Sequence, residues 1–154
     1  ISSMAGQNIG AGELKRAKKT MTTGLMIALG ISALVFLIVE IFPRELLTLF
    51  TSETDVVETG ITFLRLAAAE YMIVTPVFCM NGLAIGAGYT NVALLNAISS
   101  SIIIRVPLAY LLVRVFDLGF NGIGIAMGFA PIVSLFIGII FVQSDKWKKA
   151  KIRL

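Results

Sequence analysis

The sequence of 154 residues contains no histidine, one cysteine and only 14% charged residues, and each shortage removes a class of function. Without histidine, imidazole zinc sites and His-dependent catalytic triads have no basis. Cys79 cannot build a disulfide framework alone, and without a histidine base it is better interpreted as an inert packing residue than as a nucleophile. The Gly-x-Ser-x-Gly elbow and the phosphate-binding loop are also missing. We therefore expect no enzyme, no metal site and no cofactor.

Apolar residues dominate what is present. They make up 57% of the chain, and the mean hydropathy is +0.92. Soluble domains are about 45–50% apolar and about a quarter charged. The apolar runs do not alternate with polar residues, so barrel strands are a poor interpretation. The composition predicts an all-α, polytopic membrane helix bundle.

Uncharged stretches of bilayer length place the spans. The 20 uncharged residues after Lys19 cover about 30 Å as a helix, the thickness of a bilayer core. A second uncharged stretch, from Tyr71 to Ile104, has 34 residues and is interrupted by turn formers at 86–91. It is too long for one span, so we divide it. The prediction is four transmembrane helices over residues 20–42, 61–85, 92–115 and 120–142.

Three further segments flank these spans. Residues 1–19 are expected to form a cytoplasmic loop with the end of a preceding helix. Residues 43–58 are expected to be an outer amphipathic segment, with a short helix at Pro43 and the next long helix starting near Glu53, where Ser52 and Asp55 have capping-box spacing. Residues 143–154 form a basic cytoplasmic tail. Because the chain opens without Met at a loop motif, we expect it to be a fragment.

Basic residues indicate the orientation. Nine of the 13 lie in two clusters, Lys15–Lys19 and Lys146–Arg153, on the side that holds both termini, and only Arg44 and Arg114 lie on the other. The positive-inside rule therefore predicts cytoplasmic termini, with the chain in the plasma (inner) membrane. Basic residues in such flanks indicate the lipid bilayer as partner and leave little for nucleic acid. Trp147 is expected to be an interface anchor, with the tail on anionic headgroups.

Charges inside spans are rare enough to be candidate functional residues. By helical rise, Glu70 lies about 13 Å deep and Arg105 about 10 Å below the outer surface, on sequential antiparallel helices. We expect these two residues to face each other or to share a polar cavity. The pair can be a structural ion pair, or Glu70 can take part in a cation or proton step. Arg65, only about 6 Å deep, is expected to be an interface anchor.

Proline, asparagine and glycine add local expectations. Pro76 and Pro131 each remove a backbone donor from a span and are hinge candidates. Asn81 must find a partner in the bundle or a wet cavity, and is a transport candidate with Glu70 and Arg105. The four-residue spacing in GLAIG (82–86) and GIAMG (124–128) is typical of closely approaching helices.

Four sequence pieces then indicate a family. GQNIGAGELKRAKK at 6–19, LFTSETDVVETGITFLRL after the first span, NGLAIGAGYT at the second span's inner end, and RVPLAYLL followed by LGFNGIGIAM resemble the multidrug and toxic compound extrusion family in order and spacing. The resemblance covers nearly the whole chain. It implies two six-helix lobes around a cavity, export of cationic and amphiphilic drugs in exchange for sodium ions or protons, and a place for this chain in the last third, within the C-lobe.

The same resemblance has departures. Ile85 stands where the family often has Arg, and Tyr89 where it often has an acidic residue. The carboxylate of sodium-coupled members corresponds to a position near Val74, one turn beyond Glu70.

The function we expect is cation-coupled antiport of small cationic or amphiphilic compounds, with Na⁺ or H⁺ as coupling ion and the missing N-terminal lobe as partner. Two alternatives stay open. One is a lipid-linked oligosaccharide or polysaccharide flippase of the same superfamily. The other is a small four-helix oligomeric membrane protein without transport activity.

Overall fold

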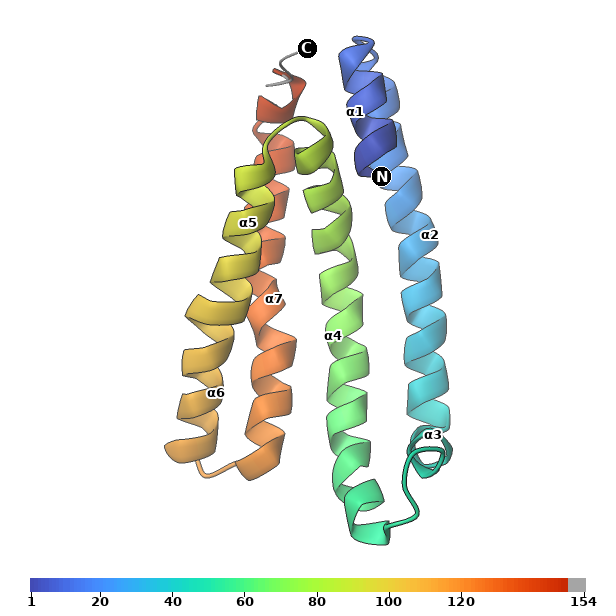
Figure 1. Ribbon diagram of the computed structural model, residues 1–154, viewed down its shortest axis with the longest axis vertical. Coiled ribbons are helices and arrows are strands. Elements are labelled where there is room, and N and C mark those ends of the chain that lie inside the picture. Colours follow the sequence, from blue (N-terminus) through green and yellow to red (C-terminus); the bar gives the residue numbers. More distant parts are fainter. Residues whose placement is uncertain (150–154) are drawn as a thin grey trace.

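The computed structural model describes residues 1–149, which are almost entirely helical and contain no strand. Figure 1 shows an elongated bundle of long helices. In chain order the elements are α1 (Ser2–Gly10), α2 (Leu14–Ile41), α3 (Pro43–Thr48), α4 (Thr54–Gly86), α5 (Thr90–Ile98), the π-helical segment η1 (Ser99–Ile104), α6 (Arg105–Arg114), α7 (Gly119–Gln143) and the 3-10 turn η2 (Lys146–Lys148).

Four of these helical stretches are long and apolar enough to cross a membrane: α2, α4, the run from Thr90 to Arg114, and α7. The four predicted spans are therefore present. The first helix begins at Leu14 rather than near residue 20, because the lysine cluster before the span is itself helical. The last five residues of the predicted basic tail, 150–154, lie outside the described residues.

The long helix α4 begins at Thr54, close to the predicted start at Glu53. The capping box is wrong, however, because no side chain caps this helix. The backbone N–H of Glu53 instead donates to the Thr51 hydroxyl at 3.2 Å. The short helix at Pro43 is confirmed as α3, with proline in its first turn, where a missing N–H costs nothing.

Helix α4 lies at the centre of the fold and contacts α1, α2, α3, α5 and α7. Helix α2 packs on one side of it, and α7 with the α5–α6 run on the other (Figure 1). The start of α2 and the end of α7 lie at the same end of the bundle, as four antiparallel crossings require (Figure 1). Gly12 and Gly88, with φ of +76° and +82°, form the turns at this end.

Small residues let α1 and α4 touch backbone to backbone. A Cβ added to Gly86 would lie 2.6 Å from the Ser2 carbonyl oxygen and 2.9 Å from the Gly6 nitrogen. A Cβ added to Gly82 would lie 3.0 Å from the Ile1 side chain, a looser contact. Close packing by the 82–86 glycine pair is thus confirmed. In the 124–128 pair only Gly124 packs tightly, against Leu66, and Gly128 has nothing within 4 Å.

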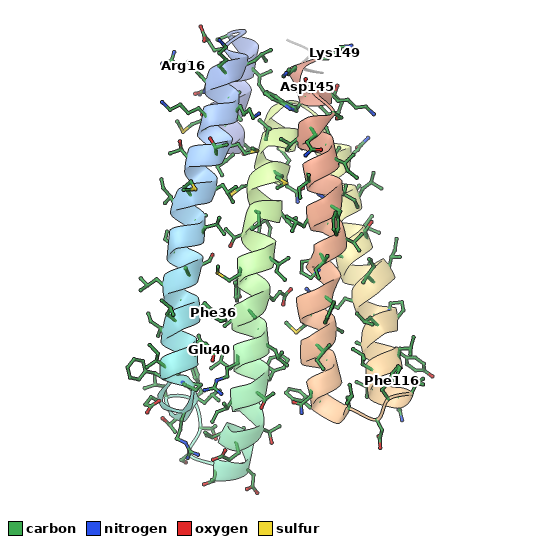
Figure 2. All side chains as sticks on the ribbon, turned by 180° about the vertical axis from the view of Figure 1, so that it is seen from behind. Arg16, Phe36, Glu40, Phe116, Asp145 and Lys149 are labelled. Atoms are coloured by element: carbon green, nitrogen blue, oxygen red, sulfur yellow. The ribbon has the colours of Figure 1, made fainter. Side chains whose placement is uncertain are left out.

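The outer face of α2 carries large apolar side chains that point away from the bundle (Figure 2). Met26, Ile27, Ile31 and Leu34 are each 59–72% exposed. A single helix face this apolar is stable only against lipid or other membrane helices. The bundle is therefore built to lie in a membrane.

The π-helical segment η1 was not expected. It ends three residues before Pro107, whose ring would clash with the carbonyl of Ile103 in a regular α-helix and which has no N–H to donate to it. Widening the helix over residues 99–104 accommodates that carbonyl. Insertions of this kind are frequent at functional sites, and this one directly precedes Arg105.

Candidate functional site

Glu70 on α4 and Arg105 at the start of α6 form an ion pair, in which Nη2 of Arg105 donates to Oε1 of Glu70. The Glu70 side chain is 12% exposed and that of Arg105 is 32% exposed. The expected juxtaposition of these two residues is therefore confirmed. Two charges this far from water lower their cost by pairing, so the contact fixes the register of α4 against α6.

The ion pair borders an open cavity of about 260 Å³ that is lined by residues of α4, α5, η1, α6 and α7. All three transport candidates line this cavity, namely Glu70, Asn81 and Arg105. Val74, near which the family resemblance predicts a carboxylate in sodium-coupled members, lines it as well. The cavity thus collects the polar side chains that three different spans carry at membrane depth.

A hydrogen-bonded group at one end of the cavity was missed by the sequence reasoning. Asn96 on α5 donates through Nδ2 to Oδ1 of Asn81 at 2.6 Å, and the Ser134 hydroxyl on α7 donates to the Asn96 carbonyl at 2.8 Å. Asn96 and Ser134 are only 1% and 2% exposed. The signal for Asn96 was the same as for Asn81, an amide inside an apolar run that must find a partner.

Two polar atoms at the cavity have no partner among the described residues, Oδ1 of Asn96 and Nε of Arg105. Buried polar groups are normally hydrogen-bonded, because leaving one unsatisfied costs about 1–3 kcal/mol. Oδ1 of Asn96 and the Glu70 carboxylate are oxygen acceptors, as are the hydroxyls of Ser100 and Ser101 on η1. Such a set can bind water or a hard cation.

Arg65, the expected interface anchor, lies outside this cavity and pairs with the end of α2. Its Nε is 3.2 Å from Oε2 of Glu40, and its guanidinium also donates to the Glu40 carbonyl at 3.3 Å. Both side chains are at least one-third exposed. Arg65 therefore ties α2 to α4 at the end of the bundle that carries α3.

Trp147, the other expected anchor, is 1% exposed and packs inside the protein. Its indole Nε1 donates to the Val142 carbonyl at 3.0 Å, and the ring joins a core cluster that includes Ala5 and Leu83. The contact with protein differs from the expected contact with headgroups, because α1 folds back over this end of the bundle.

The two hinge candidates have different surroundings. Pro131 on α7 is buried and lines the cavity, whereas Pro76 lies about two-thirds of the way along α4 beside the contact with α2. There, the Thr75 hydroxyl donates to the Tyr71 carbonyl at 2.7 Å, so the Ser32 hydroxyl must donate to Thr75 at 2.6 Å. The hinge roles of both prolines remain predictions.

The sequence model of the MatE family matches residues 1–111, well over half of the chain. The chain belongs to the MatE family. Four apolar spans and membership of this family indicate a multi-pass membrane protein.

Relatives of this MatE chain include two curated bacterial proteins. It is 30% identical to the probable multidrug resistance protein YpnP of Bacillus subtilis, over 99% of this chain and 34% of that protein. It is 26% identical to the probable multidrug resistance protein NorM of Thermotoga maritima, over 97% of this chain and 32% of that protein. The MatE chain thus spans about a third of the length of the curated relatives it matches.

A solved structure agrees on the fold. The MatE chain superposes with a TM-score of 0.87 on an inward-facing multidrug resistance MATE family transporter of the MOP superfamily. The match has 20% identity and covers 98% of this chain and 36% of that one. At that identity it shows the fold alone, including the bundle that encloses the cavity.

Proposed function

We propose that this chain is the C-terminal part of a cation-coupled antiporter that exports small cationic or amphiphilic compounds. The related proteins named above are multidrug resistance proteins, which favours drug export over lipid-linked oligosaccharide transfer. The single observation that carries the proposal is the ion pair of Glu70 and Arg105 beside a polar cavity at membrane depth. Ionisable residues in such a place typically belong to ion or substrate pathways.

The geometry suggests how coupling works. In the described state the Arg105 guanidinium neutralises Glu70. A proton or a sodium ion that binds to the Glu70 carboxylate competes with the guanidinium for the same oxygens. Release of Arg105 then loosens the contact of α4 with α6. The ion pair is thus a two-state element whose equilibrium the coupling ion shifts.

Asn81, Asn96 and the serines of η1 supply the remaining ligands. Asn96 lines the cavity, and its buried Oδ1 has no hydrogen-bond partner in the part of the chain that the structure describes, so a change in the shape of the cavity would make it a ligand for water or an incoming ion. Pro131 lines the same cavity and lacks a backbone donor, which lets α7 bend there when the cavity changes shape.

The complete transporter supplies what this chain does not contain. An N-terminal lobe is expected to face these helices across a central substrate cavity, and alternating access requires both lobes. The lysine-rich end of the bundle lies at the cytoplasmic face of the inner membrane, as the positive-inside rule predicts.

Transport by the full-length protein in proteoliposomes tests the proposal. Efflux of a fluorescent cationic dye is measured with a sodium gradient alone, a pH gradient alone, and neither. Efflux driven by one gradient and abolished by its collapse is expected. No gradient-dependent efflux of any cationic dye would contradict the proposal.

A further inference from the structure

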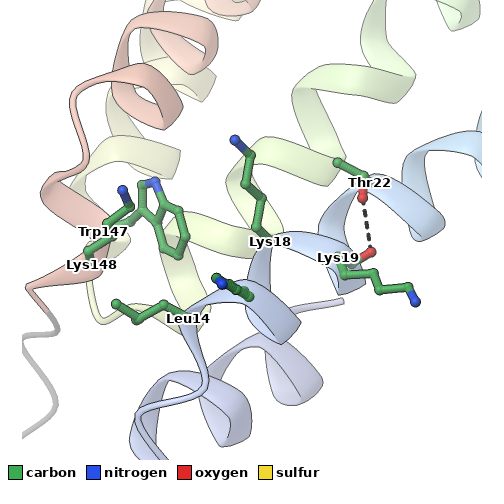
Figure 3. A pocket seen from close by; sticks show the side chains of 7 residues that line it. Leu14, Lys18, Lys19, Thr22, Trp147 and Lys148 are labelled. Carbon is green, nitrogen blue, oxygen red and sulfur yellow. Dashed lines mark hydrogen bonds between the residues drawn. The ribbon is translucent and has the colours of Figure 1, made fainter.

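A cleft of about 580 Å³ lies at the lysine-rich end of the bundle, far from the polar cavity. One wall is a face of α2 that carries three lysines, and the other is formed by η2. Figure 3 shows Leu14 and Trp147 at one end of the cleft, Lys19 and Thr22 at the other, and Lys18 between them. The residues that line it are Leu14, Lys15, Lys18, Lys19, Thr22, Trp147 and Lys148.

The charge of this cleft is positive and largely uncompensated. Lys148 pairs with Asp145 at 2.8 Å, but Lys15, Lys18 and Lys19 form no ion pair within residues 1–149. The four lysines and Asp145 leave a net charge of +3 around a single hollow. Like charges around one hollow repel one another, so an anion bound among them would stabilise the arrangement.

The walls are also apolar. The indole of Trp147 and the Leu14 side chain line the cleft, and the methylene stems of the lysines add to them. The indole of Trp147 is 1% exposed and its N–H donates to the Val142 carbonyl, so the apolar surface open to a ligand is that of Leu14 and the lysine stems. A free phosphate ion would leave this apolar surface exposed to water. The glycerol and acyl chains of a phospholipid would cover it.

The position of the cleft matches the depth of a lipid headgroup. Lys19 is the last charge before the uncharged run that begins at Thr20, so the lysines lie at the membrane boundary and Thr22 about one turn inside it. A lipid seated here would keep its phosphate among the ammonium groups and extend its chains along the exposed apolar face of α2.

We infer that this cleft binds the phosphate of one anionic phospholipid, such as phosphatidylglycerol, from the adjoining leaflet. Lys15, Lys18 and Lys19 attract the phosphate as point charges, and Leu14 with the lysine stems supports the glycerol and the first methylenes. The lipid thereby joins the start of α2 to η2, two segments that are separated by most of the chain. The inference does not depend on which ion drives transport.

Native mass spectrometry of the full-length, delipidated protein tests this inference. Phosphatidylglycerol is titrated against phosphatidylethanolamine, and one tightly bound phosphatidylglycerol is expected. Replacing Lys18 by Gln is expected to weaken it about fivefold, and the double variant K15Q/K18Q further, because each lysine near an anionic lipid contributes about that factor. The variant Lys18→Arg, which keeps the charge, is expected to retain binding.

Arg16→Gln is the matched control. Arg16 belongs to the same basic cluster but lines a different hollow, with Met4 and Asn8 of α1. Its replacement is expected to leave the bound lipid unchanged. An equal loss for Lys18→Gln and Arg16→Gln would overturn the inference, because it would indicate diffuse surface attraction. Displacement of the lipid by millimolar inorganic phosphate would also overturn it, since the site would then hold a free anion.

Discussion

Glu70 and Arg105 are 35 residues apart in the chain, yet their side chains meet inside the bundle as an ion pair between α4 and α6. Each charge lowers the cost of burying the other, and a buried charge is expensive once its partner is lost. The stability of the bundle and the proposed coupling step therefore depend on the same contact.

Removing one partner of this pair is expected to destabilise the protein more than removing both. Glu70→Gln leaves the Arg105 charge uncompensated and is expected to cost about 1–3 kcal/mol. The double variant E70Q/R105Q is expected to cost less than the sum of its single variants. Thermal unfolding of the detergent-solubilised protein, followed by size-exclusion chromatography, measures the difference. Strict additivity of the two losses would show that the side chains are not coupled.

The pair formed by Arg44 and Glu58 provides the matched control for that cycle. Both side chains are 55% exposed, and the pair joins α3 to α4 at the end of the bundle that carries α3. Exposed pairs contribute about 0–1 kcal/mol. Glu58→Gln is therefore expected to change the unfolding temperature much less than Glu70→Gln does.

Asn96→Leu is expected to destabilise the bundle by about 0.6–1.7 kcal/mol, because it removes the donor to Oδ1 of Asn81 inside the membrane. The Ser134 hydroxyl bonds to the backbone carbonyl of residue 96, so that contact survives the substitution. The Ser134→Ala loss should accordingly add to the Asn96→Leu loss in a double variant. An unfolding temperature raised by Asn96→Leu would show that this hydrogen bond does not stabilise the bundle.

Gly86→Ala and Gly128→Ala are expected to have opposite effects on stability. A Cβ at position 86 would lie 2.6 Å from the backbone oxygen of Ser2, so α1 must move away from α4, at a cost of about 1–3 kcal/mol. Position 128 has open space, and alanine there is expected to stabilise its helix by up to about 1 kcal/mol. Thermal melting curves of the two variants, measured in parallel, test whether their effects on stability are opposite. Equal behaviour would contradict the backbone contact between α1 and α4.

The fold could largely be predicted because membrane helices are recognised in a sequence by the length and apolarity of their uncharged runs. Uncharged runs gave the four spans, and the depths of Glu70 and Arg105 placed them at one level of the bundle. The start of α2 was misplaced because charged residues mark the edge of the bilayer without ending a helix. The four-residue glycine spacing predicted a close helix approach at Gly86, which the structure shows against α1. The same spacing did not predict the open space at Gly128.

The site was predictable only where a residue stood out against its surroundings. Glu70, Arg105 and Asn81 were conspicuous polar residues within apolar runs. Asn96 carried the same signal as Asn81 but was not singled out, and Ser134 was missed because neutral polar residues are common in membrane helices and their roles depend on their partners. The π-helical segment was not predicted either, because Pro107 predicts a distortion of the helix but not its form. The burial of Trp147 depends on α1 folding back, which composition does not encode.

Dye efflux by the full-length Glu70→Gln variant, driven by the gradient that powers the unaltered protein, tests the central claim most directly. The rate is normalised to folded protein, with Glu58→Gln as the matched variant outside the cavity and Glu70→Asp as the variant that keeps the charge. We predict that Glu70→Gln loses gradient-driven efflux by at least tenfold, while Glu58→Gln retains it and Glu70→Asp retains a measurable part. Unchanged gradient-driven efflux by Glu70→Gln would contradict the account, because coupling would then not pass through the ion pair with Arg105.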